Sequence, residues 1–446
     1  MKKESSFLNV VCGLAIPVAL QSMLQSSFSI VDQIMIGQLG SVSVAGVGLA
    51  GKFASIYSVV IAAIGAVAGI MISQYIGQKN GREVKRSFYM NLWLGILVAG
   101  IFTLFCVMYP GNIMGLYTRD KETRQAAGAY LQIIAGTFVP MAGATLLSTL
   151  FRSTDRPKLP LYASIASALM NTGLNYILIF GKFGLSAMGA QGAAVATVIS
   201  QWVNFLLMFA MMFGKKFGFS EDGEEEHTKT KCNWRQYLSM LLPILVCEVV
   251  WSLGENVYAA IYGHMGTDAT AAMTLINPVQ GLMIGALCGL SQAAGVIIGK
   301  KLGNEEYEEA YASSQKLILY GAFGAMALSV LVILTRDIYM EIYRVEEGVK
   351  ELTKQILVAY ALVAPFKVLN MILGGGIIRS GGQTKYVMYI DMIGTWCFGV
   401  PLGLLAAFVL NLTIPYVYFL LSLEECIRFG ISVVVFRRKN WMRRLE

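Results

Sequence analysis

The sequence predicts an all-α polytopic membrane protein with twelve transmembrane helices, arranged as two pseudo-symmetric six-helix lobes around a central cleft. Three observations predict this fold class. Hydrophobic residues make up 56% of the 446 residues and charged residues only 14%, whereas soluble domains contain about 25% charged residues. Apolar windows of about 19 residues recur along the whole chain. The two halves of the chain also repeat each other at a nearly fixed offset.

The same composition excludes several other classes of protein. A soluble enzyme would carry more charge, and a disordered chain would contain far fewer apolar residues. The seven cysteines are scattered with no C-x-x-C pair, so we expect free thiols. The sequence contains no Gly-rich phosphate loop, Ser/His/Asp set or His/Cys metal cluster. We therefore expect a protein that is not an enzyme, uses no cofactor and takes its energy from an ion gradient.

The first half contains six predicted membrane-spanning helices. The first of them, 10–36, follows Lys2 and Lys3 as the apolar part of a signal peptide would. It is too long for a signal peptide and lacks a small-residue cleavage pattern, so we expect it to be retained. The other five are apolar windows with few charges. They cover residues 46–76, 87–109, 126–151, 159–180 and 189–213.

The second half contains six more windows of the same kind. They cover residues 237–262, 268–299, 313–335, 353–378, 385–409 and 413–436. Twelve spans of about 20 residues would use roughly 240 residues. The remainder is enough for short loops but not for a large aqueous domain, so we expect the lipid bilayer to surround most of the chain.

The basic residues predict the orientation in the membrane. When successive loops are assigned alternately to the two sides, the side with both termini carries 23 Lys and Arg and the other side carries 9, while Lys316, Lys367 and Arg428 fall within spans. Because basic loops remain in the cytoplasm, both termini are predicted to be cytoplasmic. This topology explains the net charge of +8, and we expect no nucleic-acid partner, since no basic stripe interleaves with aromatic residues.

The chain is predicted to form an N-lobe, 1–213, a cytoplasmic linker, 214–236, and a C-lobe, 237–446. The linker is the one long polar stretch, and the lobes repeat each other at offset 226. Pairs at this offset include Pro17 and Pro243, Gly37 and Gly263, Gly40 and Gly266, Gly69 and Gly295, Gly77 and Gly303, and Tyr117 and Tyr343. One residue out of register, Arg152-Ser153 matches Arg379-Ser380 and Lys158 matches Lys385. Since each lobe has an even number of spans, the repeats are parallel, and transporters hold substrate between such repeats.

Carboxylates within the spans are the first functional candidates. Each costs about 2.5–3.5 kcal/mol at the centre of a membrane helix, so intramembrane acids usually serve a function. The candidates are Asp32, Glu248, Glu255, Asp391, Glu424 and Glu425. We expect only some of them to bind ions.

Asp32 is the candidate for the coupling cation. It lies late in the first helix, and Asn171 and Asn175, one turn apart on the fifth helix, are placed to offer amide oxygens to it. If the cation is sodium, we expect Asp32 and Asn171 to be metal ligands. Two other interpretations stay open: Asp32 caps an interfacial turn before Gly37, and the asparagines only join helices by hydrogen bonds.

Glu248 and Glu255 are candidates for a substrate site or a second cation site, together with Gln21 and Gln25 of the first helix. The two glutamates are seven residues apart, so both lie on one face of the seventh helix. We expect cationic small molecules as substrates.

The two lobes place their charges differently. At offset 226, Ser22 and Ser29 stand opposite Glu248 and Glu255, and Tyr258 stands opposite Asp32. This difference fits either a division of labour between the lobes or drift after duplication.

Two charge pairs are predicted within the spans. Glu424 and Arg428 are four residues apart on the twelfth helix and are placed to neutralise each other. Lys367 and Asp391 are predicted to form a second pair, between the tenth and eleventh helices.

Three motifs resemble the multidrug and toxic compound extrusion (MATE) family, in its prokaryotic form. The run Val31–Gly40 (VDQIMIGQLG), with Pro17 upstream, resembles the first-helix signature of this family, and so do Gly189–Thr197 (GAQGAAVAT) and Gln74–Gly77. The resemblance covers nearly the whole chain. It implies an antiporter driven by protons or sodium, located in the plasma membrane of a prokaryote, that expels cationic amphipathic compounds by alternating access. We expect it to be a monomer.

The resemblance also assigns residues. Asp32 matches the aspartate that family members use for the coupling cation, and Asn171 matches an asparagine of that site. Asn175 stands where several prokaryotic members carry a second aspartate, so this sequence lacks the carboxylate pair. Glu248 and Glu255 lie on the helix that bears a functional glutamate in sodium-coupled members, in a different register.

Three alternatives remain beside this one. A flippase for lipid-linked saccharides, from the same superfamily, would need several cations for pyrophosphate, and Lys367 is the one mid-span cation outside an evident ion pair. A channel would need a ring of pore-lining residues. A major-facilitator transporter would need an aspartate that the loop around Gly81-Arg82 lacks.

Overall fold

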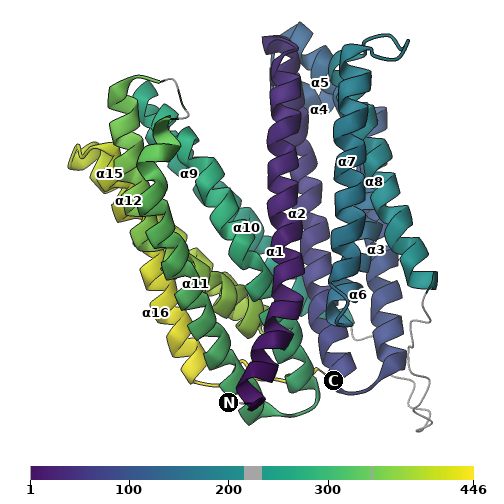
Figure 1. Cartoon of the computed structure of the whole chain (residues 1–446), viewed down its shortest axis with the longest axis vertical. Coiled ribbons are helices and arrows are strands. Elements are labelled where there is room, and N and C mark those ends of the chain that lie inside the picture. Colours follow the sequence, from purple (N-terminus) through teal and green to yellow (C-terminus); the bar gives the residue numbers. More distant parts are fainter. Residues whose placement is uncertain (1, 215–233, 342, 344, 446) are drawn as a thin grey trace. The chain divides into compact units, whose positions relative to one another are not determined.

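The computed structural model describes residues 2–214, 234–341, 343 and 345–445, and within these ranges all regular secondary structure is helical (Figure 1). Most of the predicted linker 214–236, namely 215–233, lies outside the described residues. The chain forms two compact units, one made of Met1–Ala19 with Lys229–Glu446 and the other of Leu20–Thr228. The first helix therefore belongs to one unit up to Ala19 and to the other from Leu20.

Residues 2–214, the described part of the first half, contain eight α-helices. They are α1 (Lys2–Gly37), α2 (Ser41–Gly77), α3 (Gly81–Met108), α4 (Pro110–Gly115), α5 (Lys121–Ile134), α6 (Phe138–Ser153), α7 (Lys158–Phe180) and α8 (Gly189–Gly214). A short 3₁₀ turn, η1 (Ala135–Thr137), joins α5 to α6. Together these three cover the single helix predicted at 126–151.

The second half contains long helices followed by helices with π-helical interruptions. The helices are α9 (Trp234–His264), α10 (Thr267–Gly303), α11 (Tyr307–Glu341), α12 (Glu347–Asn370), α13 (Thr384–Met392), α14 (Val400–Leu404), α15 (Ile414–Ser422) and α16 (Glu424–Arg437). The π-helical segments are η2 (Met371–Ile378), η3 (Ile393–Gly399) and η4 (Leu405–Val409). The predicted helix 385–409 is thus a chain of α- and π-helical pieces.

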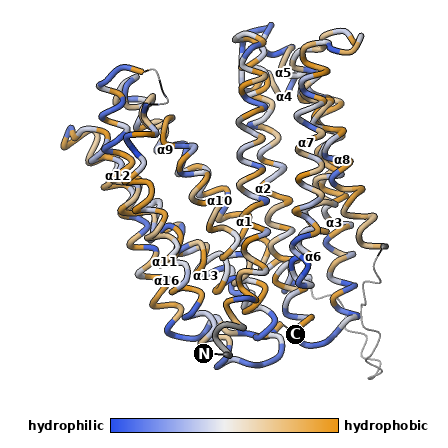
Figure 2. The backbone as a smooth tube through the Cα atoms, in the orientation of Figure 1, coloured by the Kyte–Doolittle hydropathy of each residue, from blue (hydrophilic) through white to orange (hydrophobic). Residues whose placement is uncertain are grey.

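The helices confirm the predicted membrane protein. Among the described residues, eleven helical stretches are long and apolar enough to cross a membrane. The twelfth predicted segment, 413–436, is helical but is divided into α15 and α16 at Leu423. Figure 2 shows hydrophobic residues over most of the helical length and hydrophilic residues at turns such as those between α2 and α3 and between α10 and α11. Large apolar side chains such as Trp93 and Leu334 are also exposed, as expected of residues that face lipid.

One turn shows the internal repeat directly in the backbone. Gly40 precedes α2 with a φ of 89°, and Gly266 precedes α10 with a φ of 120°. Both values lie in the region that L side chains rarely adopt. The two glycines are the predicted partners at offset 226, so the repeat preserves a turn that requires glycine.

The π-helical segments explain why the repeat slips out of register. A π-helical turn accommodates an extra residue compared with the α-helical turn that it replaces. The repeat has offset 226 at Tyr343 and offset 227 at Arg379, and η2, Met371–Ile378, lies between these two positions. An extra residue accommodated in η2 therefore accounts for the slip while the helices keep their order.

Candidate functional site

Asp32 lies within α1, five residues before its last residue, Gly37, and is half-buried. Its carboxylate faces α7, where the side-chain amide of Asn175 donates to Asp32 Oδ1 at 2.7 Å. Asp32 therefore does not cap the turn after α1, and that alternative interpretation is wrong. The carboxylate belongs to a network between helices.

The network continues from α7 to α8. The amide of Asn175 also donates to Asn171 Oδ1 at 3.2 Å, and Asn171 Nδ2 donates to the hydroxyls of Thr197 at 3.4 Å and Ser200 at 3.3 Å. Asn171, Asn175 and Ser200 are buried. We call these five residues the Asp32 site. The structure thus brings together the three residues predicted to hold the coupling cation.

The side-chain amides of the Asp32 site have two unusual features. Asn175 Oδ1 is buried and has no hydrogen-bond partner among the described residues, although buried carbonyl oxygens almost always have one. The amide of Asn171 also fits in a second orientation. Turned over, it donates to Asp32 at 3.0 Å (Oδ1) and 3.1 Å (Oδ2), and its oxygen accepts from Ser200 Oγ at 3.3 Å. The site can therefore present either an amide oxygen or an amide N–H to Asp32.

Gln21 and Gln25 lie apart from the Asp32 network. Gln21 is buried, donates to Ser164 Oγ at 2.8 Å and accepts from Arg152 at 3.3 Å. Gln25 is exposed on α1. Gln21 therefore fills a structural position within the unit Leu20–Thr228.

Glu248 and Glu255 lie on α9 and line two different pockets of the other unit. Glu248 is half-buried and its Oε1 lies 3.9 Å from the guanidinium of Arg379. Glu255 is exposed. Their common helix face, predicted from the spacing, does not place them in one site, because two helical turns separate them along the axis.

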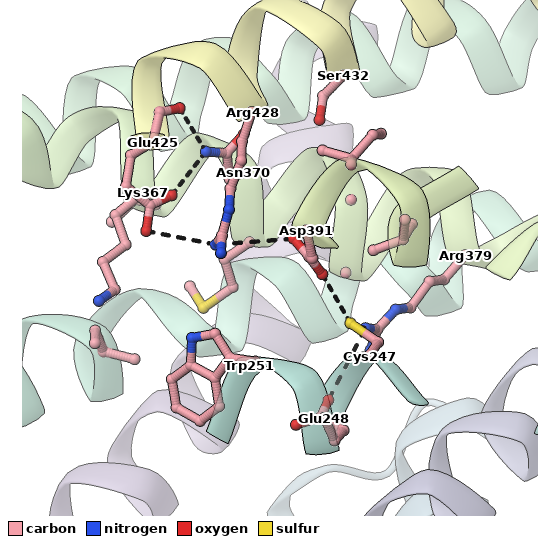
Figure 3. Close-up of a pocket in the computed structure, with 17 residues that line it drawn as sticks. Cys247, Glu248, Trp251, Lys367, Asn370, Arg379, Asp391, Glu425, Arg428 and Ser432 are labelled. Carbon is pink, nitrogen blue, oxygen red and sulfur yellow. Dashed lines mark hydrogen bonds and ion pairs between the residues drawn. The ribbon is translucent and has the colours of Figure 1, made fainter. Parts of the chain in front are cut away.

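The first pocket, which we call the Lys367–Arg379 pocket, has a volume of about 400 Å³ (Figure 3). This is within the range of small-molecule sites. Its charged lining is balanced, with three cations and three carboxylates. They are Lys367, Arg379, Arg428, Glu248, Asp391 and Glu425. Its apolar wall includes Trp251 and Ile284.

The second pocket, which we call the tyrosine pocket, has a volume of about 320 Å³. Four tyrosines line it: Tyr258, Tyr262, Tyr360 and Tyr418. Its charged lining is acidic, with Glu255, Glu424 and Glu425 against Lys367 alone. Lys367 and Glu425 also line the Lys367–Arg379 pocket, so the two pockets share part of their walls.

A largely buried ionic network contributes residues to the lining of both pockets. Arg428 lies 3.5 Å from Glu424, 3.8 Å from Glu425 and 3.8 Å from Asp391, and it donates to Thr395. We call these residues, with the hydrogen-bond donors below, the Arg428 network. The predicted pair of Glu424 with Arg428 is confirmed.

The predicted pair of Lys367 with Asp391 is wrong. Asp391 faces Arg428 and accepts from the thiol of Cys247 at 2.8 Å. Figure 3 shows the Lys367 side chain extending away from this network, and no ion pair or hydrogen bond of its ammonium group is found among the described residues. Arg428 takes the place of Lys367 because α16 carries its guanidinium between the acids.

The carboxylates of the Arg428 network also receive hydrogen bonds. Tyr258 donates to Glu424 Oε2 at 2.5 Å, and the amide of Asn370 donates to Glu425 Oε2 at 2.8 Å. Glu424, Glu425 and Arg428 are each less than a tenth exposed. Such pairing is the condition under which a buried charge is tolerated.

Several residues of these pockets do not stand out in the sequence. Asn370 and Cys247, and also Thr395 of the Arg428 network, carry no charge and give no signal in the sequence. The sequence places Arg379 in a cytoplasmic loop, but it lines the Lys367–Arg379 pocket with its side chain 17% exposed. The internal repeat does mark Arg379, because Arg379 matches Arg152 at offset 227. An arginine that is present in both halves indicates that the two make a similar contact.

A family model, MatE, matches residues 17–177 and again residues 243–405. These segments include the parts of α1, α7, α9 and α13 that carry Asp32, Asn175, Glu255 and Asp391, and together they cover more than half of the chain. This chain is a MATE family transporter. The two segments begin at offset 226 (17 and 243) and end at offset 228 (177 and 405). Because one family model matches both halves of the chain, the predicted internal repeat is confirmed.

Known proteins similar to this MATE transporter cover nearly its full length. The chain is 21% identical to "Uncharacterized transporter YisQ" of Bacillus subtilis over 100% of this chain and 97% of that protein. It is 25% identical to "Probable multidrug resistance protein NorM" of Bradyrhizobium diazoefficiens, covering 95% and 92% of the two chains. A solved structure, "Crystal structure of MATE in the straight conformation", has a TM-score of 0.88 at 16% identity and covers 97% and 96% of the two chains. That likeness supports the fold.

Proposed function

We propose that this MATE transporter is a cation-coupled multidrug antiporter, driven by protons or sodium, that exports cationic amphipathic compounds by alternating access. The observation that carries the coupling step is the Asp32 site, where a carboxylate faces an amide that fits in two orientations and a buried amide oxygen without a donor.

The two orientations of the Asn171 amide suit two charge states of Asp32. An amide oxygen near both carboxylate oxygens repels an ionised carboxylate, so that orientation requires a proton or a metal ion between them. The turned amide donates two hydrogen bonds to the carboxylate and suits the empty, ionised site. We propose that the Asn171 amide turns over when the cation leaves.

Oxygen atoms supply the ligands that either cation needs. Asp32, Asn171 Oδ1, Asn175 Oδ1 and the Thr197 hydroxyl are the available oxygens, and hard cations bind such ligands. A proton needs only Asp32 and one acceptor. Whether it is a proton or sodium, the ion that binds at this site is a transported ion and not a resident cofactor.

The tyrosine pocket is the proposed place for a cationic substrate. Its lining combines four tyrosine side chains with Glu255, and the faces of aromatic rings attract cations. The three glutamates of the lining outnumber its one lysine, and this excess of negative charge adds to the attraction. The NorM relative is named a probable multidrug resistance protein, which supports drug export.

The remaining parts of the proposal concern location and assembly. The excess of Lys and Arg on one side supports cytoplasmic termini, and the bacterial relatives support the plasma membrane of a prokaryote. A monomer contains both the Asp32 site and the tyrosine pocket, so we propose a monomer as the working unit.

The lipid-linked saccharide flippase is a weaker candidate. Such a protein would need an excess of cations to hold pyrophosphate. The Lys367–Arg379 pocket does contain three cations, but three carboxylates balance them. The charge of this pocket therefore does not favour a pyrophosphate group.

The test is ethidium flux in proteoliposomes of the purified protein, with a proton gradient and a sodium gradient imposed in separate experiments. Flux driven by one gradient and abolished by its collapse supports the antiporter and identifies the ion. Liposomes without protein are the control for leakage. Equal ethidium movement with and without either gradient would contradict coupling.

A further inference from the structure

The segment that follows α16, Arg438–Leu445, folds back onto its own unit. Lys439 has a φ of 58°, and the chain turns there after the helix. Trp441 is fully buried, and its indole N–H donates to the carbonyl oxygen of Phe436 at 3.1 Å, in the last turn of α16. Leu445 is also buried. We call Arg438–Leu445 the strap.

The buried ring of Trp441 holds the strap more firmly than the charges of the strap do. Trp441 stacks on Phe436 with the ring centroids 5.7 Å apart, and Phe436 stacks on Tyr311 of α11 at 4.8 Å. A buried aromatic side chain removes a large apolar area from water, whereas solvent-exposed ion pairs contribute little. The exposed ion pairs of the strap are Lys439 with Glu308 and Arg444 with Glu305.

The strap packs on the turn that joins η2 to α13. A Cβ at Gly381 would overlap the carbonyl oxygen of Trp441. A Cβ at Gly382 would lie 3.1 Å from Leu445 Cδ2 of the strap and 3.3 Å from Met240 Sδ of α9. The strap and α9 therefore contact the same turn.

This turn has a counterpart in the unit Leu20–Thr228 at offset 227. Gly382 has a φ of 72°, and its N–H donates to the carbonyl oxygen of Arg379 at 2.9 Å. Asp155, the counterpart of Gly382, has a φ of 60°, and its N–H donates to the carbonyl oxygen of Arg152 at 3.2 Å. The two turns therefore share one backbone hydrogen bond and one left-handed residue.

The residue before the left-handed position differs between the two turns. It is Thr154 in the unit Leu20–Thr228 and Gly381 in the other unit. Gly381 does not have a positive φ, so the turn itself permits a side chain at this position, as Thr154 shows. The three atoms nearest to a Cβ at Gly381 belong to Trp441 and Arg443 of the strap. The glycine is therefore explained by the strap and not by the turn.

The same turn follows Arg379, which lines the Lys367–Arg379 pocket. Figure 3 shows the Arg379 side chain extending toward Cys247 and Glu248, and its guanidinium lies 3.6 Å from the Cys247 sulfur and 3.9 Å from Glu248 Oε1. Charge-assisted hydrogen bonds are about 2.7–2.9 Å long, so this ion pair is loose. The Nε–H of Arg379 has no hydrogen-bond partner among the described residues. The contacts of the guanidinium alone therefore do not fix the side chain.

We propose that the strap positions Arg379. The buried ring of Trp441 holds the turn at Gly381, and the turn places the guanidinium against Cys247 and Glu248. Trp441 lines neither pocket, so it is a positioning residue that acts on transport through Arg379. The effect on transport rests on the proposed export function, whereas the contact of the strap with the turn is measurable without it.

The first experiment measures amide hydrogen exchange by mass spectrometry on the full chain in lipid nanodiscs. Trp441→Ala removes the ring, and Gly381→Thr introduces the residue of the other repeat where the Trp441 carbonyl lies. Each should raise the exchange rate of residues 379–385 about tenfold, because the turn opens locally. Residues 152–158, the matching turn, should exchange at the wild-type rate in the same samples. Arg438→Ala, an exposed residue of the strap, is the control and should change neither turn.

The second experiment measures gradient-driven ethidium flux in proteoliposomes that contain equal amounts of inserted protein. Arg379→Met should slow the flux about tenfold, in line with the loss of a charged group's contacts. Trp441→Ala should slow the flux of the wild type but change that of Arg379→Met less than about twofold, because residues that act through one another are not additive. Trp441→Phe, which keeps an aromatic ring in the strap, should retain most of the flux.

Three results would overturn the proposal. One is wild-type exchange at residues 379–385 in both Trp441→Ala and Gly381→Thr. Another is an equal rise in both turns, which would mean that the whole protein is loosened. The third is multiplication of the two flux losses in the double variant, which would mean that Trp441 acts independently of Arg379. If the wild type moves no ethidium under either gradient, the proposed export function fails, and the exchange rates alone decide whether the strap holds the turn.

Discussion

The two units of this transporter hold polar groups in different ways, although both descend from the same helical repeat. In Leu20–Thr228 a single carboxylate, Asp32, faces the amides of α7. In the other unit three carboxylates surround Arg428. The first arrangement has one ionisable group and an amide oxygen without a hydrogen-bond donor. In the second arrangement, ion pairs to Arg428 join the helices. The difference shows that the repeat fixes where polar groups meet and that the residues placed there decide the chemistry.

One set of contacts recurs in both units and makes this comparison concrete. Gln21 contacts Ser164 and Arg152. Their counterparts at offsets 226 and 227 are Cys247, Asp391 and Arg379, and Cys247 likewise contacts both. In the first unit the central contact is an amide with a hydroxyl. In the second unit it is a thiol with a carboxylate, and that carboxylate extends the contact to Arg428.

The largest effect on stability is expected in the unit that contains the Arg428 network. Arg428→Leu leaves the buried Glu424 and Glu425 and the half-buried Asp391 without their shared cation and should lower stability by about 3–5 kcal/mol. Thermal unfolding of the purified protein, followed by intrinsic fluorescence, measures the change. Arg437→Leu, an exposed residue at the end of the same helix, is the control and should have little effect. A second substitution, Glu424→Gln, should restore part of the loss, and no restoration would count against the network.

The next effect tests how the second unit makes room for its acids. Gly399 packs against the acids of the second unit, and a Cβ there would overlap Tyr258 Oη and the Glu424 carboxylate. Gly399→Ala should therefore destabilise the protein by about 1–3 kcal/mol. Gly430→Ala, on α16 with no atom near its Cβ position, should be neutral or stabilising by up to about 1 kcal/mol. Equal unfolding temperatures for the two variants would show that the position is not crowded.

A smaller effect is expected on transport when the first unit loses an amide. Asn175→Leu keeps the size of the side chain but removes the donor to Asp32, and it should slow gradient-driven ethidium flux about tenfold, equivalent to one lost charge-assisted hydrogen bond. Asn256→Leu, an exposed asparagine on α9, is the control for membrane insertion. Wild-type flux from Asn175→Leu would remove Asn175 from the coupling site.

The smallest effect tests the recurring contact itself. Ser164→Ala removes the acceptor of Gln21 and should cost about 1 kcal/mol, since the pair is neutral. Cys247→Ala should cost a similar amount, because Asp391 keeps Arg428 as its partner. The two unfolding temperatures should fall by similar amounts. A much larger loss from Cys247→Ala would mean that the thiol, rather than Arg428, holds Asp391 in place.

The fold is largely predictable from the sequence because hydropathy is a local property. Each predicted span is apolar whatever its neighbours are, so its existence follows from composition. The π-helical segments are not predictable, since they have the same apolar composition as the α-helices around them. Their trace in the sequence is the slip of the repeat from offset 226 to offset 227, which can be interpreted only once η2 is seen.

The candidate site is predictable only in part, for a physical reason. Asp32, Asn171 and Asn175 can be grouped because a four-residue spacing places both asparagines on one helix face. The predicted partner of Asp391 is wrong because Lys367 and Arg428 compete for it, and the outcome depends on how α16 packs. Arg379 escapes prediction because an arginine at a helix end has the same sequence pattern whether it faces water or a pocket.

The central claim is that the units divide the work, with Asp32 coupling the cation and the tyrosine pocket holding the drug. The most direct test measures two properties of one variant, Asp32→Asn: the Kd for ethidium by fluorescence polarisation, and ethidium flux driven by the coupling gradient. The account predicts that the Kd stays within about twofold of wild type while the flux is lost. Glu255→Gln should instead act on binding, and should weaken the affinity for ethidium about tenfold, or about 1.4 kcal/mol. Two results for Asp32→Asn would contradict the account. One is a loss of ethidium binding as large as the loss of flux, and the other is flux at the wild-type level.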